Sequence, residues 1–86
     1  MIEKTVTVMN KAGLHARTAA LFVTRAGDFT CDIRLVRNGK EANARSIMGI
    51  MSLGITRGAE ITIKAEGEDA PEAVAALAAM VQAFAD

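Results

Sequence analysis

The alternation of apolar and polar residues along 59–65 constrains the fold of this chain more than any other feature. Every second residue there is apolar, namely Ala59, Ile61, Ile63 and Ala65. Because successive side chains of a strand point to opposite faces, the pattern predicts a strand with one buried and one wet face. Residues 31–37 alternate in the same way, and residues 2–8 do so with Lys4 as the exception. Half-buried strands of this kind are typical of an antiparallel sheet.

The remaining segments predict one more strand and three helices. Asn38-Gly39 predicts a tight hairpin into a short strand over 40–44, because both turn positions tolerate positive φ. Helices are expected over 16–26, from Ser46 to about Leu53-Gly54, and over 70–84. Asp69 and Glu72 are spaced as a capping box at the start of the last helix.

Two helices carry apolar stripes that would face the sheet. The stripe of the first is Ala19, Ala20, Val23 and Ala26, with Gly27 as its stop, and that of the last is Ala73, Leu77, Met80, Val81 and Phe84. The order β-α-β-β-α-β-α predicts an α+β fold in one domain, residues 1–86. It is an open-faced two-layer sandwich, a four-stranded antiparallel sheet with its helices packed on one face.

Composition excludes several classes of function. Lys+Arg and Asp+Glu are 10 each and the only aromatic residues are three Phe, so neither phosphate neutralisation nor base stacking on nucleic acid is expected. No apolar run approaches the about 20 residues that span a bilayer, so no membrane insertion is expected. The first residues lack the apolar core of a signal peptide, which predicts a cytoplasmic protein. Cys31 and His15, each the only one of its kind, predict neither a disulfide nor a metal site, and no cofactor is expected.

His15 is the residue best placed for chemistry. It stands between a loop containing Gly13 and a helix that starts at about Ala16. A helix N-terminus presents unsatisfied N–H groups and a partial positive charge, which favour a bound anion. Neutral imidazole is a nucleophile, and the guanidinium of Arg17 is suited to grip phosphate oxygens. Spacing alone also permits a plain solvated residue at the helix start.

Several stretches of the chain resemble the HPr family, the histidine-containing phosphocarrier proteins of the phosphoenolpyruvate-dependent sugar phosphotransferase system. The likeness is in register along essentially the whole chain. The matching stretches are Gly13-Leu14-His15-Ala16-Arg17 with Ala19-Ala20, Asn38-Gly39-Lys40, Ser46 to Gly54, Gly58 to Ile63 and Gly67-Glu68-Asp69. Two separate motifs at their expected separation are more specific than either alone.

The resemblance implies a phosphoryl relay. Enzyme I would phosphorylate His15 on Nδ1, and phospho-His15 would pass the group to IIA domains of sugar permeases. Arg17 would act with His15, and Ala16, Arg17 and Thr18 would bind the phosphoryl group. Family members usually have proline where this chain has Thr18, so a Thr18 N–H is expected as an additional ligand.

The resemblance also implies regulation at Ser46, which would be a substrate of an HPr kinase/phosphorylase and act with a catabolite-control regulator. Ser46 on pattern alone is a helix N-cap. The segment that follows Ser46 contains more apolar residues than one face of so short a helix can bury. Some of these residues should therefore be exposed and dock partners. The docking residues implied are Arg17, Thr24, Arg25, Ile47, Met48 and Met51, with Val23, Ile50 and Leu53 in the core.

Two other functions remain open. A regulatory HPr paralogue, in nitrogen-type phosphotransfer or as a catabolite-repression co-effector, would share the chemistry and differ in partners. A paralogue devoted only to serine-based regulation would be expected to lack His15. A protein-binding module would leave His15 inert. A self-contained enzyme is not expected, because no base is paired with a nucleophile.

Overall fold

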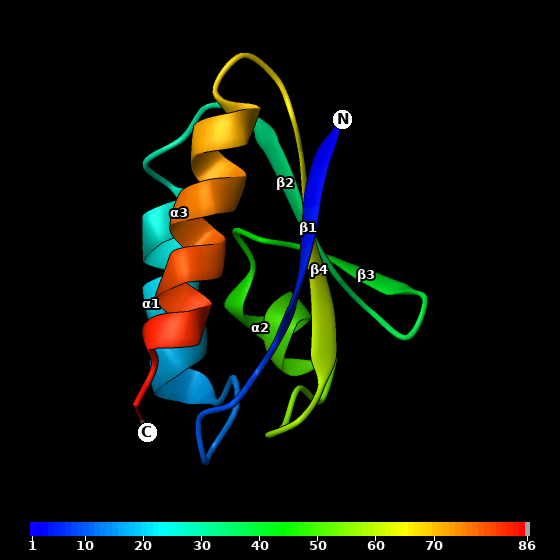
Figure 1. Cartoon of the computed structure of the whole chain (residues 1–86), viewed down its shortest axis with the longest axis vertical. Coiled ribbons are helices and arrows are strands. Elements are labelled where there is room, and N and C mark those ends of the chain that lie inside the picture. The colour runs from blue at the N-terminus through cyan, green and yellow to red at the C-terminus, as the bar shows by residue number, and fades with distance from the viewer. Residues whose placement is uncertain (86) are drawn as a thin grey trace.

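The fold is built on one antiparallel sheet with strand order β1-β4-β2-β3. The computed structural model describes residues 1–85. In chain order the elements are β1 (Ile2–Thr7), α1 (Ala16–Ala26), β2 (Asp32–Arg37), β3 (Lys40–Asn43), α2 (Ile47–Met51), β4 (Glu60–Glu66) and α3 (Ala70–Ala83). The predicted element order, sheet type and class are confirmed. All three helices lie on the same side of the sheet, with α1 and α3 side by side (Figure 1).

The alternation of apolar residues determines which face of each strand is buried. Ile33 of β2 stands opposite Ala65 of β4, and Leu35 stands opposite Ile63. All four side chains are buried against the helices, as their sequence pattern predicts. Ile2 is the exception, because it lies at the open end of the edge strand β1 and remains exposed.

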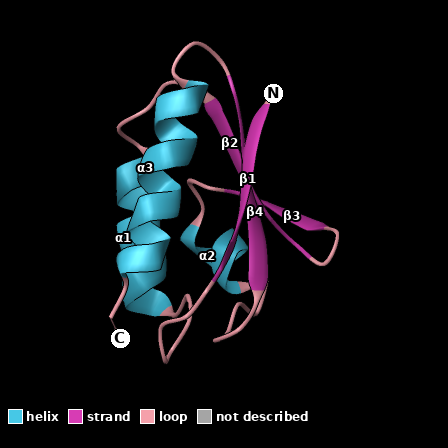
Figure 2. Cartoon of the chain, viewed as in Figure 1, coloured by secondary structure: helices cyan, strands magenta, loops and turns pink. Residues whose placement is uncertain are grey.

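The hairpin between β2 and β3 forms at Asn38-Gly39, as predicted. Both residues have positive φ, 51° and 80°. That backbone geometry matches the twist of the flanking strands, and glycine reaches it without steric cost. The hairpin extends away from the helices at the edge of the sheet (Figure 2).

The apolar stripe of α1 is turned slightly from its predicted position. Ala19 and Ala26 are buried, but Ala20 and Val23 are only half-buried. Phe22, outside the predicted stripe, is the largest fully buried side chain of the helix. It lies at i+3 from Ala19 and i−4 from Ala26, so the buried face is centred on the phenyl ring.

The capping box predicted for Asp69 and Glu72 is wrong. Asp69 is the N-cap residue of α3, but its side chain makes no hydrogen bond to its own helix. Its carboxylate instead accepts hydrogen bonds from the N–H of Thr30 at 2.9 Å and of Cys31 at 3.0 Å. The hydrogen bond from Thr30 N–H is the main cause that lowers the pKa of Asp69. Asp69 therefore ties α3 to the segment that enters β2.

Candidate functional site

His15 caps the N-terminus of α1 with its own ring. Its backbone is extended, with φ −97° and ψ −170°, and the imidazole turns back over the first turn. Nδ1 accepts a long hydrogen bond of 3.4 Å from the backbone N–H of Arg17. The backbone N–H of Thr18 also donates to the His15 side chain. The nitrogen that the resemblance marks for phosphorylation is therefore held as an acceptor at the positive end of a helix.

Thr18 completes a reciprocal capping box with His15. The N–H of His15 donates to Thr18 Oγ1 at 3.1 Å. Thr18 Oγ1 in turn donates to the carbonyl oxygen of Gly13 at 2.9 Å. The residue is fully buried. The sequence predicted a role for its N–H but missed the role of the hydroxyl.

The loop before His15 is fixed against the segment that precedes β4. Leu14 N–H donates to the carbonyl oxygen of Ile55 at 3.1 Å. Gly13 has a φ of 67°, and a Cβ added there would overlap that same oxygen of Ile55. Asn10 Nδ2 donates to Gly13 O at 2.8 Å, a buried hydrogen bond. The sequence predicts a loop at Asn10–Gly13, and Asn at the first and Gly at the last position of a four-residue turn is a common pattern, but this role of Asn10 was not predicted.

The electrostatic surroundings of the α1 N-terminus are positive. Its first turn contains no acidic residue. Ala16 and Arg17, the first two residues of the helix, are both exposed, and the His15 residue that precedes them is half-buried. An anion at the ring would meet N–H groups and a cation together. The four residues predicted to bind phosphate or react, His15 to Thr18, lie together in one helical turn.

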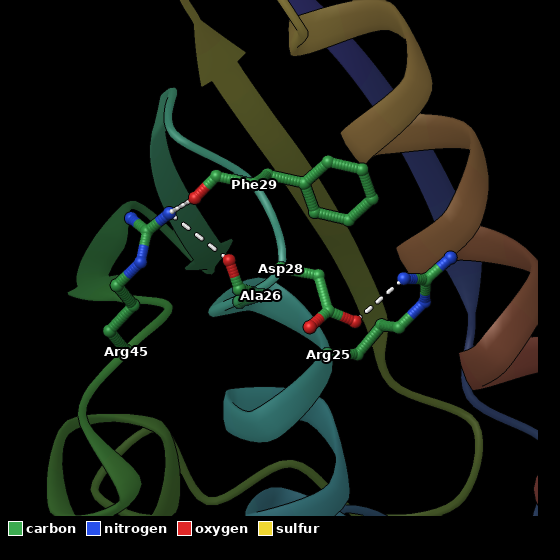
Figure 3. Close-up of polar contacts among 5 residues, drawn as sticks. All are labelled: Arg25, Ala26, Asp28, Phe29 and Arg45. Carbon is green, nitrogen blue, oxygen red and sulfur yellow. Dashed lines mark hydrogen bonds and ion pairs between the residues drawn. The ribbon is translucent and has the colours of Figure 1, made fainter.

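Ser46 caps the short helix α2. Its Oγ accepts from Gly49 N–H at 3.0 Å, as the sequence predicts for an N-cap. The neighbouring Arg45 donates to the carbonyl oxygens of Ala26 at 3.1 Å and Phe29 at 2.6 Å. Its guanidinium therefore binds the C-terminal end of α1 and the loop that follows it (Figure 3).

An apolar surface lies beside this cap. Met48 is 79% exposed, and Ile47 and Met51 are about half that, at 40% and 41%. Ile50 and Leu53 are buried, as predicted, whereas Val23 is only half-buried and packs against the core. Leu21 of α1, which was not singled out, is 48% exposed on the helix that packs against α2. We call Ile47, Met48 and Met51, which are neighbours on the short helix α2, the apolar patch.

Two further predicted docking residues lie on α1, toward its C-terminal end. Thr24 is exposed. Arg25 is half-buried and pairs with Asp28 at 2.8 Å, while its guanidinium carbon lies 5.1 Å from the centre of the Phe29 ring (Figure 3). A partner that engages Arg25 would compete with these internal contacts.

Other features of residues 1–85 add no second site. No three His, Cys, Asp or Glu side chains of this part lie together as metal ligands would. None of its helices is long and apolar enough to cross a membrane. Burial, followed by the nearby Asp69 carboxylate, raises the pKa of the Cys31 thiol.

An open-faced α+β sandwich with a histidine at the cap of its first helix is the arrangement that the resemblance to the HPr family implies. Comparison with known proteins agrees. Residues 2–83 match the family described as the PTS HPr component phosphorylation site, and the chain belongs to this HPr family.

The chain is similar both to HPr-like proteins named Crh and to HPr proteins. It is 52% identical to the HPr-like protein Crh of Bacillus subtilis (strain 168), over 95% of this chain and 96% of that protein. It is 57% identical to a phosphocarrier protein HPr from Bacillus anthracis str. Ames, with a TM-score of 0.90, over 94% and 96% of the two chains. An HPr from Thermoanaerobacter tengcongensis has a TM-score of 0.92 at 48% identity, over 95% of this chain and 92% of that one.

Proposed function

We propose that this HPr-family protein carries a phosphoryl group on His15, accepting it from enzyme I and passing it to IIA domains of sugar permeases. The observation that carries the proposal is the position of His15 Nδ1, an acceptor of N–H groups at the start of α1 with Arg17 beside it. An Nδ1 atom that accepts hydrogen bonds has its lone pair in the ring plane and carries no proton. That lone pair is the nucleophile.

The transfer step needs no other group on this chain. The lone pair of Nδ1 forms the bond to phosphorus while the bond between phosphorus and the donor breaks, and the donor leaves with that electron pair. The hydrogen bonds from Arg17 N–H and Thr18 N–H to Nδ1 are lost in the step. We expect both N–H groups, with that of Ala16 and the guanidinium of Arg17, to bind the phosphoryl oxygens instead. Positioning and charge stabilisation of this kind are the main protein contributions to phosphoryl transfer.

The docking surface proposed for both partners is the apolar patch with Arg17, Thr24 and Arg25. Exposed methionines are flexible and polarisable, which suits a surface that meets more than one partner. Each partner has to leave after transfer, so we expect small interfaces.

The test is intact-mass spectrometry after incubation with phosphoenolpyruvate and enzyme I. The expected result is one acid-labile phosphoryl group on the wild-type protein and none on His15→Ala. Ser46→Ala is the second variant, and it should still be modified. A wild-type protein that stays unmodified with its cognate enzyme I would contradict the proposal.

A second candidate is a regulatory HPr paralogue that acts as a catabolite-repression co-effector through phospho-Ser46. Its support is Ser46 at the cap of α2 beside the apolar patch, together with the similarity to Crh, which is described as the catabolite repression HPr of Bacillus subtilis. A phosphate on Ser46 would add roughly two negative charges to that surface, and these charges would repel acidic partners. The kinase/phosphorylase and a catabolite-control regulator would then be its partners.

Incubation with ATP and an HPr kinase/phosphorylase separates the two candidates. An acid-stable phosphate on wild-type but not on Ser46→Ala protein would support the regulatory role. If enzyme I also modifies His15, both roles belong to one chain. Modification of Ser46 alone would leave only the regulatory role.

A further inference from the structure

The two buried polar side chains of residues 1–85 converge on one atom. Asn10 and Thr18 are the only polar residues of this part that are buried. Both donate to the carbonyl oxygen of Gly13, from Nδ2 at 2.8 Å and from Oγ1 at 2.9 Å. A carbonyl oxygen has two lone pairs, so two donors satisfy it fully. Burying polar groups is costly unless they are paired, so this clamp on Gly13 is a highly specified feature.

The hydroxyl of Thr18 links this clamp to the reactive ring. Its single proton goes to Gly13 O, and the His15 carbonyl at 3.4 Å is the weaker alternative. Its lone pair accepts the N–H of His15 at 3.1 Å. The hydroxyl therefore fixes the backbone on both sides of Leu14, whose own N–H is bound to Ile55 O.

Fixing the His15 backbone determines what its ring can do. The ring reaches the N–H groups of Arg17 and Thr18 only from the extended cap conformation that His15 adopts. While Nδ1 accepts those N–H groups, the proton of a neutral ring must lie on Nε2.

We propose that the Thr18 hydroxyl is a positioning group that keeps His15 in the Nε2–H tautomer, with Nδ1 directed at the N-terminus of α1. The importance of this role for phosphoryl transfer rests on the proposed function, but the tautomer itself is a property of the unphosphorylated protein. The hydroxyl does not touch the phosphoryl group. It acts through the backbone of Gly13 and His15.

Proline at this position would order the same turn in another way. It fixes φ covalently, but it has neither an N–H for Nδ1 nor a hydroxyl for Gly13 O. In this chain hydrogen bonds replace the covalent restraint, and they add one donor to the ring. The three substitutions Thr18→Ser, Thr18→Val and Thr18→Pro therefore separate the two groups. Serine keeps both, valine keeps only the N–H, and proline keeps neither.

The first experiment measures the ring ¹⁵N chemical shifts of His15, which distinguish the two neutral tautomers, at a pH where the ring is neutral. The expected result is one tautomer, Nε2–H, in wild-type and Thr18→Ser proteins and a mixture in Thr18→Val. Thr5→Val is the matched control. It removes a threonine hydroxyl that is bonded at 2.8 Å to Thr62 on the outer face of the sheet, and it should leave the His15 signals unchanged.

The proposal is overturned if Thr18→Val keeps the wild-type signals. Should that variant not fold, the wild-type protein still decides, because a ring protonated on Nδ1 contradicts the proposal without any substitution. Loss of the Nε2–H tautomer in Thr18→Ser would contradict it as well.

The second experiment follows the lifetime of the phosphohistidine once the protein is charged by enzyme I. Thr18→Val keeps the N–H but no longer fixes its position, so the lifetime should be roughly tenfold shorter. Thr18→Pro lacks the N–H altogether and should shorten the lifetime at least as much, and Thr18→Ser should stay close to wild type. Equal lifetimes in all four proteins would overturn the role in transfer. If the wild-type protein accepts no phosphoryl group, the proposed function fails, and the ¹⁵N experiment still tests the role of Thr18.

Discussion

The first turns of α1 and α2 both begin at a residue that family resemblance marks for phosphorylation, yet the two turns are built differently. At α1, the cap acceptor is a ring nitrogen, the capping box is reciprocal, and Thr18 buries its hydroxyl beneath it. At α2, a single bond from Gly49 N–H to Ser46 Oγ caps a helix of five residues.

The difference concerns the atom that would be modified. Nδ1 of His15 must give up its cap bonds to react, because its only in-plane lone pair becomes the bond to phosphorus. Oγ of Ser46 keeps a lone pair after modification, and the attached phosphate adds three more acceptors. A turn that loses its cap during the reaction needs other restraints, and the network of Asn10, Gly13 and Thr18 provides them for α1 alone.

The largest difference between the two turns is expected in how strongly a glycine-to-alanine substitution lowers the free energy of unfolding. At Gly13, an alanine would be strained at φ 67° and would overlap the carbonyl oxygen of Ile55. We expect Gly13→Ala to lower the free energy of unfolding by about 3 to 5 kcal/mol, measured by urea denaturation. At Gly49, a Cβ would lie 3.1 Å from Ser46 Oγ, and the gain in helix propensity offsets that contact. Gly49→Ala should therefore stay within about 1 kcal/mol of wild type.

Gly58→Ala is the control for backbone strain. Gly58 has a φ of 90°, and a Cβ there would have nothing within 4 Å. The expected loss is about 1 kcal/mol, from conformation alone. A loss at Gly13 no larger than this would show that the contact with Ile55 is not restrictive.

Asp69 extends the comparison to the third helix, where the cap residue serves another segment. Its pKa is lowered in the folded protein from an ordinary value of 3.8, mainly by the Thr30 N–H bond. The stability it contributes is therefore complete above its unfolded pKa and disappears as the pH falls through the lower, folded pKa. Asp69→Asn should be less stable than wild type at pH 7 and approach it once the pH has fallen below the lowered pKa of the folded carboxyl.

Thermal unfolding between pH 7 and pH 2 measures this effect. Glu68→Gln is the matched control, since it removes the adjacent carboxylate and should leave the pH dependence of wild type in place. A constant difference between Asp69→Asn and wild type across the whole range would contradict the assignment.

The smallest effect is expected at the α2 cap. Ser46→Ala should cost about 1 kcal/mol of unfolding free energy, because Gly49 N–H loses its acceptor. Ser46→Asp keeps an acceptor at the cap and should remain within about 0.5 kcal/mol of wild type. Denaturant titration of both variants tests the pair, and equal losses would mean that the cap bond contributes little.

Most of the fold could be predicted from local pattern. Alternation in 31–37 and 59–65, the Asn38-Gly39 turn and the Ser46 cap are short-range signals, and the structure has the two strands within about one residue. The helix after Ser46 starts as predicted but ends at Met51, two residues before Leu53. The Asp69-Glu72 spacing was an equally clear local signal and was wrong. The N–H groups of Thr30 and Cys31, far away in sequence, donate to the two oxygens of the Asp69 carboxylate, which therefore does not cap its own helix.

The candidate site divides in the same way. The sequence alone predicted His15, Arg17 and the helix N-terminus as a site, because a histidine between a glycine loop and a helix start is a local arrangement. Exposure of Met48 and Met51 followed from the excess of apolar residues in a short segment. The role of Asn10 could not be predicted from the sequence, because it depends on the burial of the Gly13 carbonyl oxygen.

By itself the sequence determined the strands, the turn, the helix starts and the histidine at the first of them, because each depends on residues within a few positions of one another. Only the tertiary structure decided that Ile55 would lie against Gly13, that Phe22 would centre the buried face of α1, and that the hydroxyl of Thr18 would be enclosed. Those outcomes depend on contacts between distant segments, and burial then compels every enclosed polar group to find a partner.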